Sequence, residues 1–430
     1  MTVQTDTALR KELIYSIFIR NFSPEGTFKG VIPQLDRIKA LGTDIIWFLP
    51  FYPIGEKNRK GQAGSPYAIK DYRAVDPNYG TMEDFKNLCN EIHKRGMKVM
   101  IDIVYNHTSP DSVLVETHPE WFFKKADGSM GNQVGDWTDI VDLDYKQAGL
   151  WEYQIETLKQ WAKLVDGFRC DVAPLVPVDF WVKARQAVEE VKPGIIWLSE
   201  TVHLSFIREL RSLGVLAHSD SEIYQAFDMT YDYDVRDLFD AYLKDEIPLS
   251  TYVNRLDIQE AIFPANYVKL RNIENHDNPR AKALIPNEES LLQWTSFIYL
   301  QKGATLLYNG QEVQEDHVPT LFDDDKINWS AGRNISQELV TLAKIQKEDI
   351  PMDAAYSVTA VDDLDTAILT YKEADQSFIG ICSFKNKFGK VSVPVLDGTY
   401  INLINGKEVT VKDGQVETES ISIAFKAPNK

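Results

Sequence analysis

The sequence predicts an α/β protein in which a closed barrel of eight parallel strands and eight helices precedes an antiparallel β-sandwich. From Glu12 to about Lys347, short β-branched or aromatic runs alternate with amphipathic helical stretches, as in repeated βα units around a parallel sheet. Several of these runs are almost continuously hydrophobic, which indicates strands buried on both faces. After Pro351 the pattern changes to short strands separated by turn residues such as "DGT" and "NGK", as in a sandwich.

The strand candidates of the barrel number eight. In chain order they are "ELIYSIFIRNF", "DIIWFLPFYP", "KVMIDIVYNH", "GFRCDVA", "IIWLSET", "IYQAFDMTYD", "NYVKLRNIENHD" and "ATLLYNGQE". The stretch "TMEDFKNLCNEIHKRG" illustrates a helix between them, because Thr81 and Asp84 form a capping box and Gly96 follows its end. The residues predicted to face the core are Phe85, Leu88, Cys89 and Ile92. An open, doubly wound sheet is the alternative, and eight βα units favour the closed barrel.

One connection departs from this alternation. The stretch from Thr108 to about Tyr145, after the third strand, is rich in Gly, Asp, Pro and Trp and shows no clear helix. Long loops within compact domains are usually functional, so we expect a small domain over the barrel mouth. The predicted domains are therefore the barrel (1–107 and 146–349), the short inserted domain (108–145) and the C-terminal sandwich (350–430).

The composition limits the compartment and the partners. With 44% hydrophobic and 26% charged residues, the 430-residue chain has the composition of a globular protein. A net charge of −18 disfavours binding to nucleic acid or to an anionic membrane. We find neither a signal peptide nor an apolar run long enough to span a bilayer. Three cysteines without framework spacing suit a reducing compartment, so we expect a soluble, cytoplasmic protein of undetermined oligomeric state.

Polar residues gather at the predicted C-terminal ends of the strands, where barrel enzymes carry their chemistry. They come from the third strand (Asp102, Asn106 and His107), the fourth (Arg169 and Asp171), the fifth (Glu200) and the seventh (His276 and Asp277). Four strands therefore contribute acids and histidines to one rim.

Arg169 and Asp171 alternate with Cys170, so strand geometry turns both side chains into the barrel. A neighbouring guanidinium favours the ionised carboxylate and lowers its pKa, which suits a nucleophile. A buried ion pair that fixes strand register is the alternative interpretation.

Glu200 ends the hydrophobic run "IIWLSE". A lone carboxylate with apolar neighbours has a raised pKa and can act as a general acid, although a solvated glutamate at a strand end is the simpler interpretation. An aspartate with a lowered pKa beside a glutamate with a raised one is the arrangement that glycosidases use.

The histidines and carboxylates of the rim have other interpretations. His107 and His276 could donate hydrogen bonds to hydroxyl groups, or could be ordinary satisfied side chains. A metal site would use three carboxylates, but Arg169 would compete with the cation and no HxH or HExxH spacing supplies nitrogen ligands. The sequence contains no P-loop and no GxGxxG motif after a strand, so nucleotide chemistry has no support.

Four short segments occur in order at these strand ends: "DIVYNH", "GFRCDVA", the end of the Glu200 strand, and "ENHD". With them the sequence resembles the α-amylase family of retaining glycoside hydrolases and transglycosylases, glycoside hydrolase family 13. The resemblance covers nearly the whole chain. It implies a (β/α)8 TIM barrel with a short domain inserted after the third strand and a C-terminal sandwich.

The resemblance also implies the catalytic roles. Asp171 would be the nucleophile, Glu200 the acid/base, and Asp277 a third carboxylate that binds sugar hydroxyls and stabilises the transition state. Retaining chemistry needs nucleophile and acid about 5 Å apart, which adjacent strands can supply.

The substrate contacts follow from the same resemblance. Arg169 would orient Asp171, while His107 and His276 would hold hydroxyls of the glycosyl unit being cleaved. Tyr67 of "SPYAIKDY" would stack under the ring of that unit, and Arg280 of "HDNPR" would lie beside it.

No cofactor is required for this chemistry, and two departures argue against structural calcium. "RNFSPEGTFKG" replaces the aspartate-rich calcium loop that many relatives carry after the first strand, and "APLVP" follows the nucleophile in place of Lys-His. Asn106 and Asp142 match two calcium-binding positions, but calcium prefers six to eight oxygens. We therefore expect no metal ligands in this chain.

The linkage is the open question. Val172, directly after the nucleophile, resembles α-1,6-glucosidases, and "APLVP" resembles sucrose-acting transglucosidases. The compact insert favours hydrolysis of α-1,4 bonds in maltooligosaccharides or α-glucans. Transglycosylation on the same scaffold is the second hypothesis, and a non-catalytic carbohydrate-binding protein is the third, although all three carboxylates are present.

Overall fold

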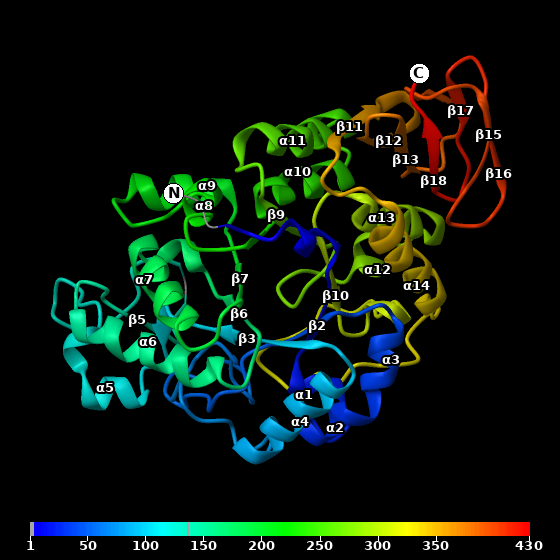
Figure 1. Ribbon diagram of the computed structural model, residues 1–430. Helices are drawn as coiled ribbons and strands as arrows, with labels where there is room; N and C mark the ends of the chain where they lie inside the picture. Colours follow the sequence, from blue (N-terminus) through cyan, green and yellow to red (C-terminus); the bar gives the residue numbers. More distant parts are fainter. Residues whose placement is uncertain (1–3, 136) are drawn as a thin grey trace. The chain divides into compact units, whose positions relative to one another are not determined.

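The computed structural model describes residues 4–135 and 137–430. Eight parallel strands close into a barrel in the order β1-β10-β9-β8-β7-β6-β3-β2 (Figure 1). They are β1 (Leu13–Ile17), β2 (Ile45–Phe48), β3 (Lys98–Ile103), β6 (Gly167–Cys170), β7 (Ile196–Ser199), β8 (Met229–Tyr231), β9 (Val268–Arg271) and β10 (Ala304–Tyr308). Each lies within one of the eight predicted runs. The predicted (β/α)8 barrel is therefore confirmed.

Helices follow the strands along the chain. The longer ones are α4 (Met82–Lys94), α6 (Ala148–Ala162), α7 (Val178–Glu189), α8 (Leu204–Ser212), α10 (Tyr233–Leu243), α11 (Leu249–Ile262), α13 (Glu288–Leu300) and α14 (Ser336–Lys344). Shorter ones are α1 (Ile19–Phe22), α2 (Phe28–Val31), α3 (Leu35–Ala40), α9 (Asp220–Ile223) and α12 (Ala281–Leu284). No helix in the described ranges is long and apolar enough to cross a membrane.

Helix α4 forms for the local reasons that its sequence indicates. The Thr81 hydroxyl accepts the N–H of Asp84, and the Asp84 carboxylate accepts the N–H of Thr81, which completes the predicted capping box. The four predicted core residues are buried, and Gly96 takes the left-handed φ of +67° just after the helix.

The inserted segment contains more regular structure than the sequence indicated. Strand β4 (His107–Thr108) pairs antiparallel with β5 (Val141–Asp142), and a five-residue helix, α5 (Val113–Thr117), lies between them. The expectation of no helix in this segment was therefore wrong. Ser112 caps α5 by accepting the N–H of Val115, but five residues are too few to show a helical period in the sequence.

The chain divides into two compact units, and both contribute strands to the barrel. The first contains Ile14–Tyr231 and Pro319–Asn328, and the second contains Thr5–Leu13, Asp232–Val318 and Trp329–Lys430. The domain boundaries given above, 1–107 with 146–349, 108–145 and 350–430, stay a prediction.

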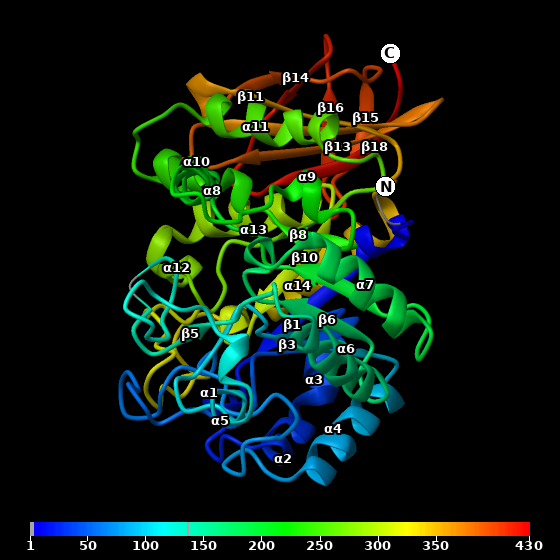
Figure 2. The same ribbon diagram turned by 90° about the vertical axis from the view of Figure 1, so that its left-hand side faces the viewer.

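The second unit includes the predicted antiparallel sandwich (Figure 2). One sheet has the order β11-β12-β13-β18, and two smaller sheets pair β14 with β17 and β15 with β16. The strands are β11 (Ala355–Val361), β12 (Thr366–Lys372), β13 (Gln376–Ser383), β14 (Lys390–Ser392), β15 (Gly398–Ile401), β16 (Glu408–Val411), β17 (Gln415–Glu417) and β18 (Ile423–Pro428). Apolar residues of these sheets share one core, as the sandwich prediction requires.

Helices α11 and α13 share a second hydrophobic core with the sheet of β11, β12 and β13. The Trp294 ring of α13 stacks on Phe384 with centroids 3.7 Å apart. Gln293 of α13 accepts hydrogen bonds from the N–H of Ser383 at 3.0 Å and from the hydroxyl of Ser422 at 2.6 Å. These contacts attach α13 to the sandwich.

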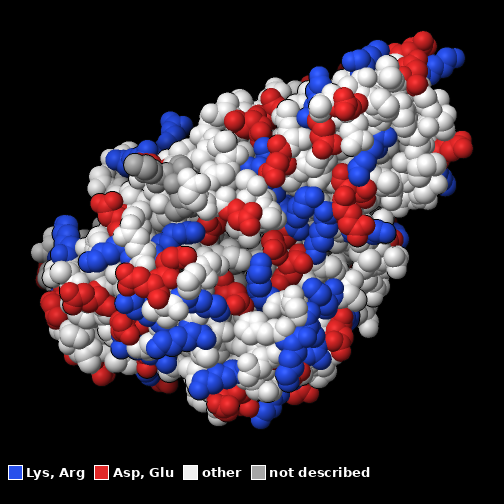
Figure 3. Space-filling model, viewed as in Figure 1, with Lys and Arg blue, Asp and Glu red and all other residues white. Residues whose placement is uncertain are grey.

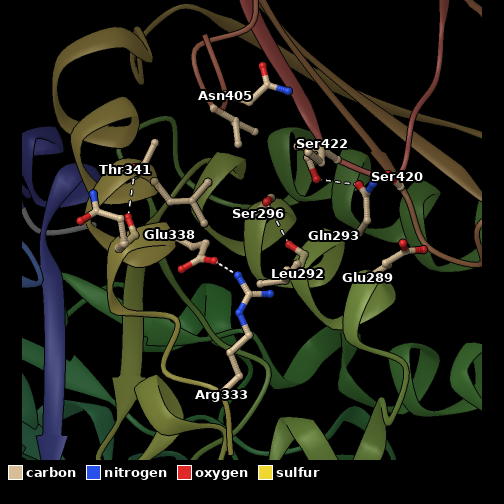
Figure 4. Close-up of a pocket in the computed structure, with 14 residues that line it drawn as sticks. Glu289, Leu292, Gln293, Ser296, Arg333, Glu338, Thr341, Asn405, Ser420 and Ser422 are labelled. Carbon is tan, nitrogen blue, oxygen red and sulfur yellow. Dashed lines mark hydrogen bonds and ion pairs between the residues drawn. The ribbon is translucent and has the colours of Figure 1, made fainter. Parts of the chain in front are cut away.

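A cavity of about 550 Å³ lies beside this junction, between α13, α14 and loops of the sandwich (Figure 4). Several polar side chains of its wall already bond protein groups. Ser296 donates to the carbonyl of Leu292, Ser422 donates to Gln293, and Arg333 pairs with Glu338. We therefore interpret the cavity as a packing gap between these helices and the sandwich, and not as a ligand site.

Candidate active site

Arg169 is the centre of a cluster of charges at the ends of three neighbouring barrel strands. Its Nη1 lies 2.8 Å from Asp102 Oδ1 and 2.9 Å from Asp171 Oδ1, and its Nη2 lies 3.0 Å from Glu200 Oε2. The carboxylates belong to β3 and to the residues that follow β6 and β7. Parallel pairing of β6 with β3 and β7 sets this convergence, since Asp102 and Leu198 are both register partners of Arg169. One guanidinium therefore bridges three carboxylates.

Carboxylates and aromatic rings stabilise this buried cation. Burial alone disfavours the charged guanidinium, but Asp102 and Glu200 outweigh it and hold the pKa of Arg169 well above its usual value. The guanidinium also lies close to three aromatic rings, at distances that allow cation–π attraction. These rings are Trp47 at 5.2 Å, Tyr67 at 5.7 Å and Tyr231 at 5.4 Å from the centroid.

Asp171 and Glu200 are nearly buried but keep some contact with solvent, with 9% and 10% of their side chains exposed. The N–H of Asp171 donates to the carbonyl of Ile103, and that of Glu200 donates to the carbonyl of Cys170. These bonds extend the ladder of the barrel and fix both backbones. The predicted ion pair of Arg169 with Asp171 is present. Because Arg169 also contacts Glu200, its guanidinium holds the carboxylates of Asp171 and Glu200 side by side.

The environment of Glu200 differs from the prediction. The sequence suggested a lone carboxylate with apolar neighbours, but Oε2 lies against Arg169 and accepts the N–H of Val172 at 2.8 Å. The expected apolar isolation was therefore wrong. The apolar residues precede Glu200 on its own strand, whereas the charged partner comes from the neighbouring strand β6.

Val172 reaches Glu200 through a strained backbone. It adopts φ +36° and ψ +42°, the left-handed region, which is a genuine outlier for a β-branched residue. Such conformations cost about 1 to 3 kcal/mol and persist where surrounding structure enforces them, often at functional sites. Here the turn directs a backbone donor at a carboxylate, a feature that sequence inspection missed.

Asp102 and Tyr67 support Arg169 from the side of β3. Asp102 is fully buried, and its Oδ2 accepts the hydroxyl of Tyr67 at 3.1 Å. The carbonyl of Asp102 also accepts the Tyr52 hydroxyl at 2.7 Å. Tyr67, predicted to contact substrate, is therefore part of the Arg169 cluster.

His107, the first residue of β4, is buried and shares a hydrogen bond with the backbone of Tyr67. The Asn106 amide contacts His107 Nδ1 at 3.2 Å, and donation from the amide would leave the ring proton on Nε2. Burial lowers the pKa of His107 below its ordinary value of 6.5, against the opposing charges of Asp142 and Asp139. The neutral ring can donate a hydrogen bond.

The two residues that match calcium positions, Asn106 and Asp142, make contacts with protein groups. Asp142 Oδ2 accepts the N–H of Gln133 at 2.7 Å, and the Asn106 amide is directed at His107. Burial raises the pKa of Asp142, and none of the residues that the structure describes forms a hydrogen bond with its Oδ1. Two oxygen-bearing side chains fall short of the six to eight ligands that calcium takes. Over residues 4–135 and 137–430, no group of three or more His, Cys, Asp and Glu side chains could hold a metal ion.

The second unit carries the remaining predicted residues after β9. His276 Nε2 lies 3.1 Å from Asp277 Oδ2, and the Asp277 side chain is 38% exposed while that of His276 is buried. Arg280 Nη1 pairs with buried Glu274 at 2.8 Å and donates to the carbonyl of Asn309 at 3.0 Å. Its guanidinium lies 4.5 Å from the centroid of the Tyr308 ring. Sequence inspection missed Glu274 as the partner of Arg280, although "ENHDNPR" contains both.

A family model for the α-amylase catalytic domain matches residues 5–137 and 121–355. The chain belongs to the α-amylase family. A second model, the C-terminal domain of bacterial α-amylases, matches residues 357–425 of this α-amylase-family chain.

Known relatives of this α-amylase-family protein agree with the assignment. The crystal structure of an α-amylase from Lactobacillus plantarum has 47% sequence identity and a TM-score of 0.94, over 98% of this chain and 100% of the other. The α-amylase MalA of Haloarcula japonica is 27% identical over 386 residues, 84% of this chain and 55% of that protein. An α-1,4-glucan:maltose-1-phosphate maltosyltransferase of Bifidobacterium longum is 33% identical over 222 residues, 46% of this chain and 29% of that protein. The chain thus matches about half or less of the length of these two curated relatives.

Proposed function

We propose that this protein is a retaining glycoside hydrolase that cleaves α-1,4-glucosidic bonds in maltooligosaccharides or α-glucans through a covalent glycosyl-enzyme intermediate. The observation that carries the proposal is the shared guanidinium of Arg169, which holds Asp171 and Glu200 side by side at the ends of neighbouring strands. Membership of the α-amylase family and the likeness to the Lactobacillus plantarum α-amylase support it.

In the first step, the Asp171 carboxylate attacks the anomeric carbon while Glu200 protonates the glycosidic oxygen that leaves. The bond between the anomeric carbon and the glycosidic oxygen breaks, and an ester bond between the Asp171 carboxylate and the anomeric carbon forms. Glu200 Oε2 already accepts the N–H of Val172 and faces Arg169, so the proton to be delivered belongs on Oε1. Arg169 keeps Asp171 negative and oriented until it reacts.

In the second step, Glu200 acts as the base. It takes a proton from water, and the resulting nucleophile attacks the anomeric carbon and releases Asp171. Two displacements at one carbon return the α configuration. The proton lost in the first step returns to Glu200, so the enzyme is regenerated.

The other predicted residues would bind the sugar. We assign Asp277 to sugar hydroxyls, since its carboxylate is the more exposed member of the pair with His276. His107 and His276 would contact hydroxyls of the cleaved unit, and Tyr67 would stack under its ring. Arg280 would act beside them from its fixed position on Glu274.

Transglycosylation is the alternative outcome of the same intermediate, because a sugar hydroxyl can replace water in the second step. Similarity to the Bifidobacterium longum maltosyltransferase supports this transglycosylation alternative. Action on α-1,6 bonds or on sucrose is the further alternative that Val172 and the residues after it suggested.

The partners and the compartment are part of the proposal. On the face shown in Figure 3, Lys and Arg are interspersed with Asp and Glu, and a net charge of −18 suits a neutral glucan better than an anionic partner. Cys89, Cys170 and Cys382 are free and buried, which supports a cytoplasmic location. We also propose that the reaction requires no cofactor or metal.

Product analysis tests the function. The purified protein is incubated separately with soluble starch, maltooligosaccharides, isomaltose and sucrose, with and without a sugar acceptor, and Asp171→Asn serves as the inactive control. We expect short α-1,4 products from starch and maltooligosaccharides, released first as the α anomer in proton NMR spectra. Release of the β anomer would contradict the retaining mechanism. Turnover of sucrose or isomaltose alone would show that the substrate is not an α-1,4-linked glucan.

A further inference from the structure

A second cavity, of about 450 Å³, lies in the first unit between the loop after β2, the start of the inserted segment and its later half. The inserted segment runs past the labels α5 and β5 in Figure 1. The side chains that matter for its chemistry are Lys57, Asn58, Lys125, Asn132, Trp137 and Thr138. Among residues 4–135 and 137–430, its lining contains two lysines and no acidic residue, in a protein whose net charge is −18.

The polar groups of this cavity have unused hydrogen-bonding capacity. Asn58 Nδ2 donates to the carbonyl of Thr138, and Asn132 Nδ2 donates to the carbonyls of Val134 and Gly135. Within the described ranges, the Oδ1 atoms of both asparagines and the Thr138 hydroxyl have no protein partner.

Trp137 connects this cavity with the candidate active site. Its ring centroid lies 6.0 Å from that of His107 and 6.5 Å from that of Phe206 in α8, the helix after Glu200. The indole also packs against Ile54 and Ile140, which hold it in place. A chain that passes His107 therefore meets the same indole that lines the cavity.

We propose that this cavity binds a segment of the α-glucan chain remote from the bond being cleaved, with a sugar ring against Trp137. An indole offers a flat apolar surface to the C–H face of a sugar. Amide oxygens accept hydrogen bonds from hydroxyl groups, and ammonium groups donate to them. The indole and the neutral polar groups favour an uncharged polyhydroxyl ligand over an anion.

This inference rests on the proposed function and adds a preference for long substrates. Binding energy from a remote part of the substrate raises kcat/KM only for chains long enough to reach it. Maltoheptaose and maltotriose are therefore the informative pair, and the ratio of their kcat/KM values is the quantity to measure.

The variants are Trp137→Ala, Trp137→Phe and Thr138→Val, with Trp151→Ala as the control. Trp151 lies in α6, outside this cavity, where its indole N–H donates to the carbonyl of Tyr145. We expect Trp137→Ala to lower the ratio about tenfold and Thr138→Val about twofold. Trp137→Phe keeps an aromatic face and should retain most of the ratio, and Trp151→Ala should leave it at the wild-type value.

A direct binding measurement separates this inference from the function itself. Maltoheptaose is titrated by calorimetry into Glu200→Gln, with and without Trp137→Ala, and the double variant should bind about tenfold more weakly. Unchanged affinity, an unchanged kcat/KM ratio, or equal losses for both sugars would overturn the inference. Displacement of maltoheptaose by inorganic phosphate would also overturn the inference, because it would show that the lysines of the cavity bind an anion. If the wild type cleaves neither sugar, the proposed function fails, and the titration still shows whether the cavity binds maltoheptaose.

Discussion

Replacing Arg169 by lysine tests the central feature of the site. The guanidinium contacts three carboxylates, at 2.8, 2.9 and 3.0 Å, through two nitrogens that point in different directions. A lysine ammonium is a single point of charge and cannot reproduce that fork. Arg169→Lys therefore keeps the net charge of the site but leaves at least one of Asp102, Asp171 and Glu200 without its cation.

The magnitude follows from the burial of these groups. The Asp102 side chain is fully buried, and those of Asp171 and Glu200 are at most 10% exposed. Breaking a buried ion pair by removing one partner costs about 3 to 5 kcal/mol. We expect a loss of that size in the free energy of unfolding, measured by urea titration. Because Asp171 and Glu200 would also lose their common anchor, kcat/KM for maltotriose should fall by at least about 100-fold.

Arg185→Lys is the matched control. Arg185 forks onto a single carboxylate, Asp228, at 2.8 and 2.9 Å, and it lies outside the Arg169 cluster. This variant should lose stability and keep its activity in the fraction that is folded. If Arg169→Lys retained wild-type stability and turnover, the guanidinium would not be the anchor of the catalytic carboxylates, and the mechanism would need another one.

Four further outcomes are expected. Asp171→Ala should abolish hydrolysis while the circular dichroism spectrum stays that of the wild type, because it removes the nucleophile and little core packing; near-wild-type turnover would exclude the nucleophile role. The pH profile of kcat/KM should be bell-shaped, since Asp171 must be ionised and Glu200 protonated, and a flat profile from acid to alkaline pH would contradict these roles. Burial lowers the pKa of His107 below 6.5, so protons bind more readily to the unfolded chain, and stability should fall as the pH drops below about 6.5. Urea titrations at several pH values should show a smaller fall in His107→Gln, and an equal fall would assign the acid sensitivity to other groups. Dialysis against a chelator should leave the activity and the melting temperature unchanged, and a loss that calcium restores would show that ligands beyond Asn106 and Asp142 hold an ion.

Features that depend on neighbouring residues in the chain were predictable from the sequence. The capping box of Thr81 and Asp84, the buried face of α4 and the eight strands all follow from local pattern, and the structure has each of them. The pairing of Arg169 with Asp171 belongs to the same class, because strand alternation alone puts the two on one face. The helix α5 was missed because five residues contain too little pattern to identify it.

Features that depend on a partner distant in the sequence were not predictable in this way. Glu200 looked isolated because the residues before it on β7 are apolar, yet its charged partner lies on β6, 31 residues earlier in the numbering. For the same reason, the hydrogen bond from the Tyr67 hydroxyl to Asp102 was not predicted, because the loop that carries Tyr67 follows a different strand. In a parallel barrel the side chains that meet at the mouth come from neighbouring strands separated by whole helices, so the ionisation of a catalytic group is decided by residues that no local window contains.

Val172 shows how such a distant contact can require a local strain. Its side chain gives no reason for a left-handed backbone, and a β-branched residue is a poor choice for that conformation. The N–H that it directs at Glu200 Oε2 gives a reason, because hydrogen bonding at one oxygen leaves the other to carry and deliver the proton. The strain is thus explained by the carboxylate that follows the neighbouring strand. In the proposed mechanism, Val172 would contribute to acid/base catalysis through its backbone N–H, whichever side chain it carries.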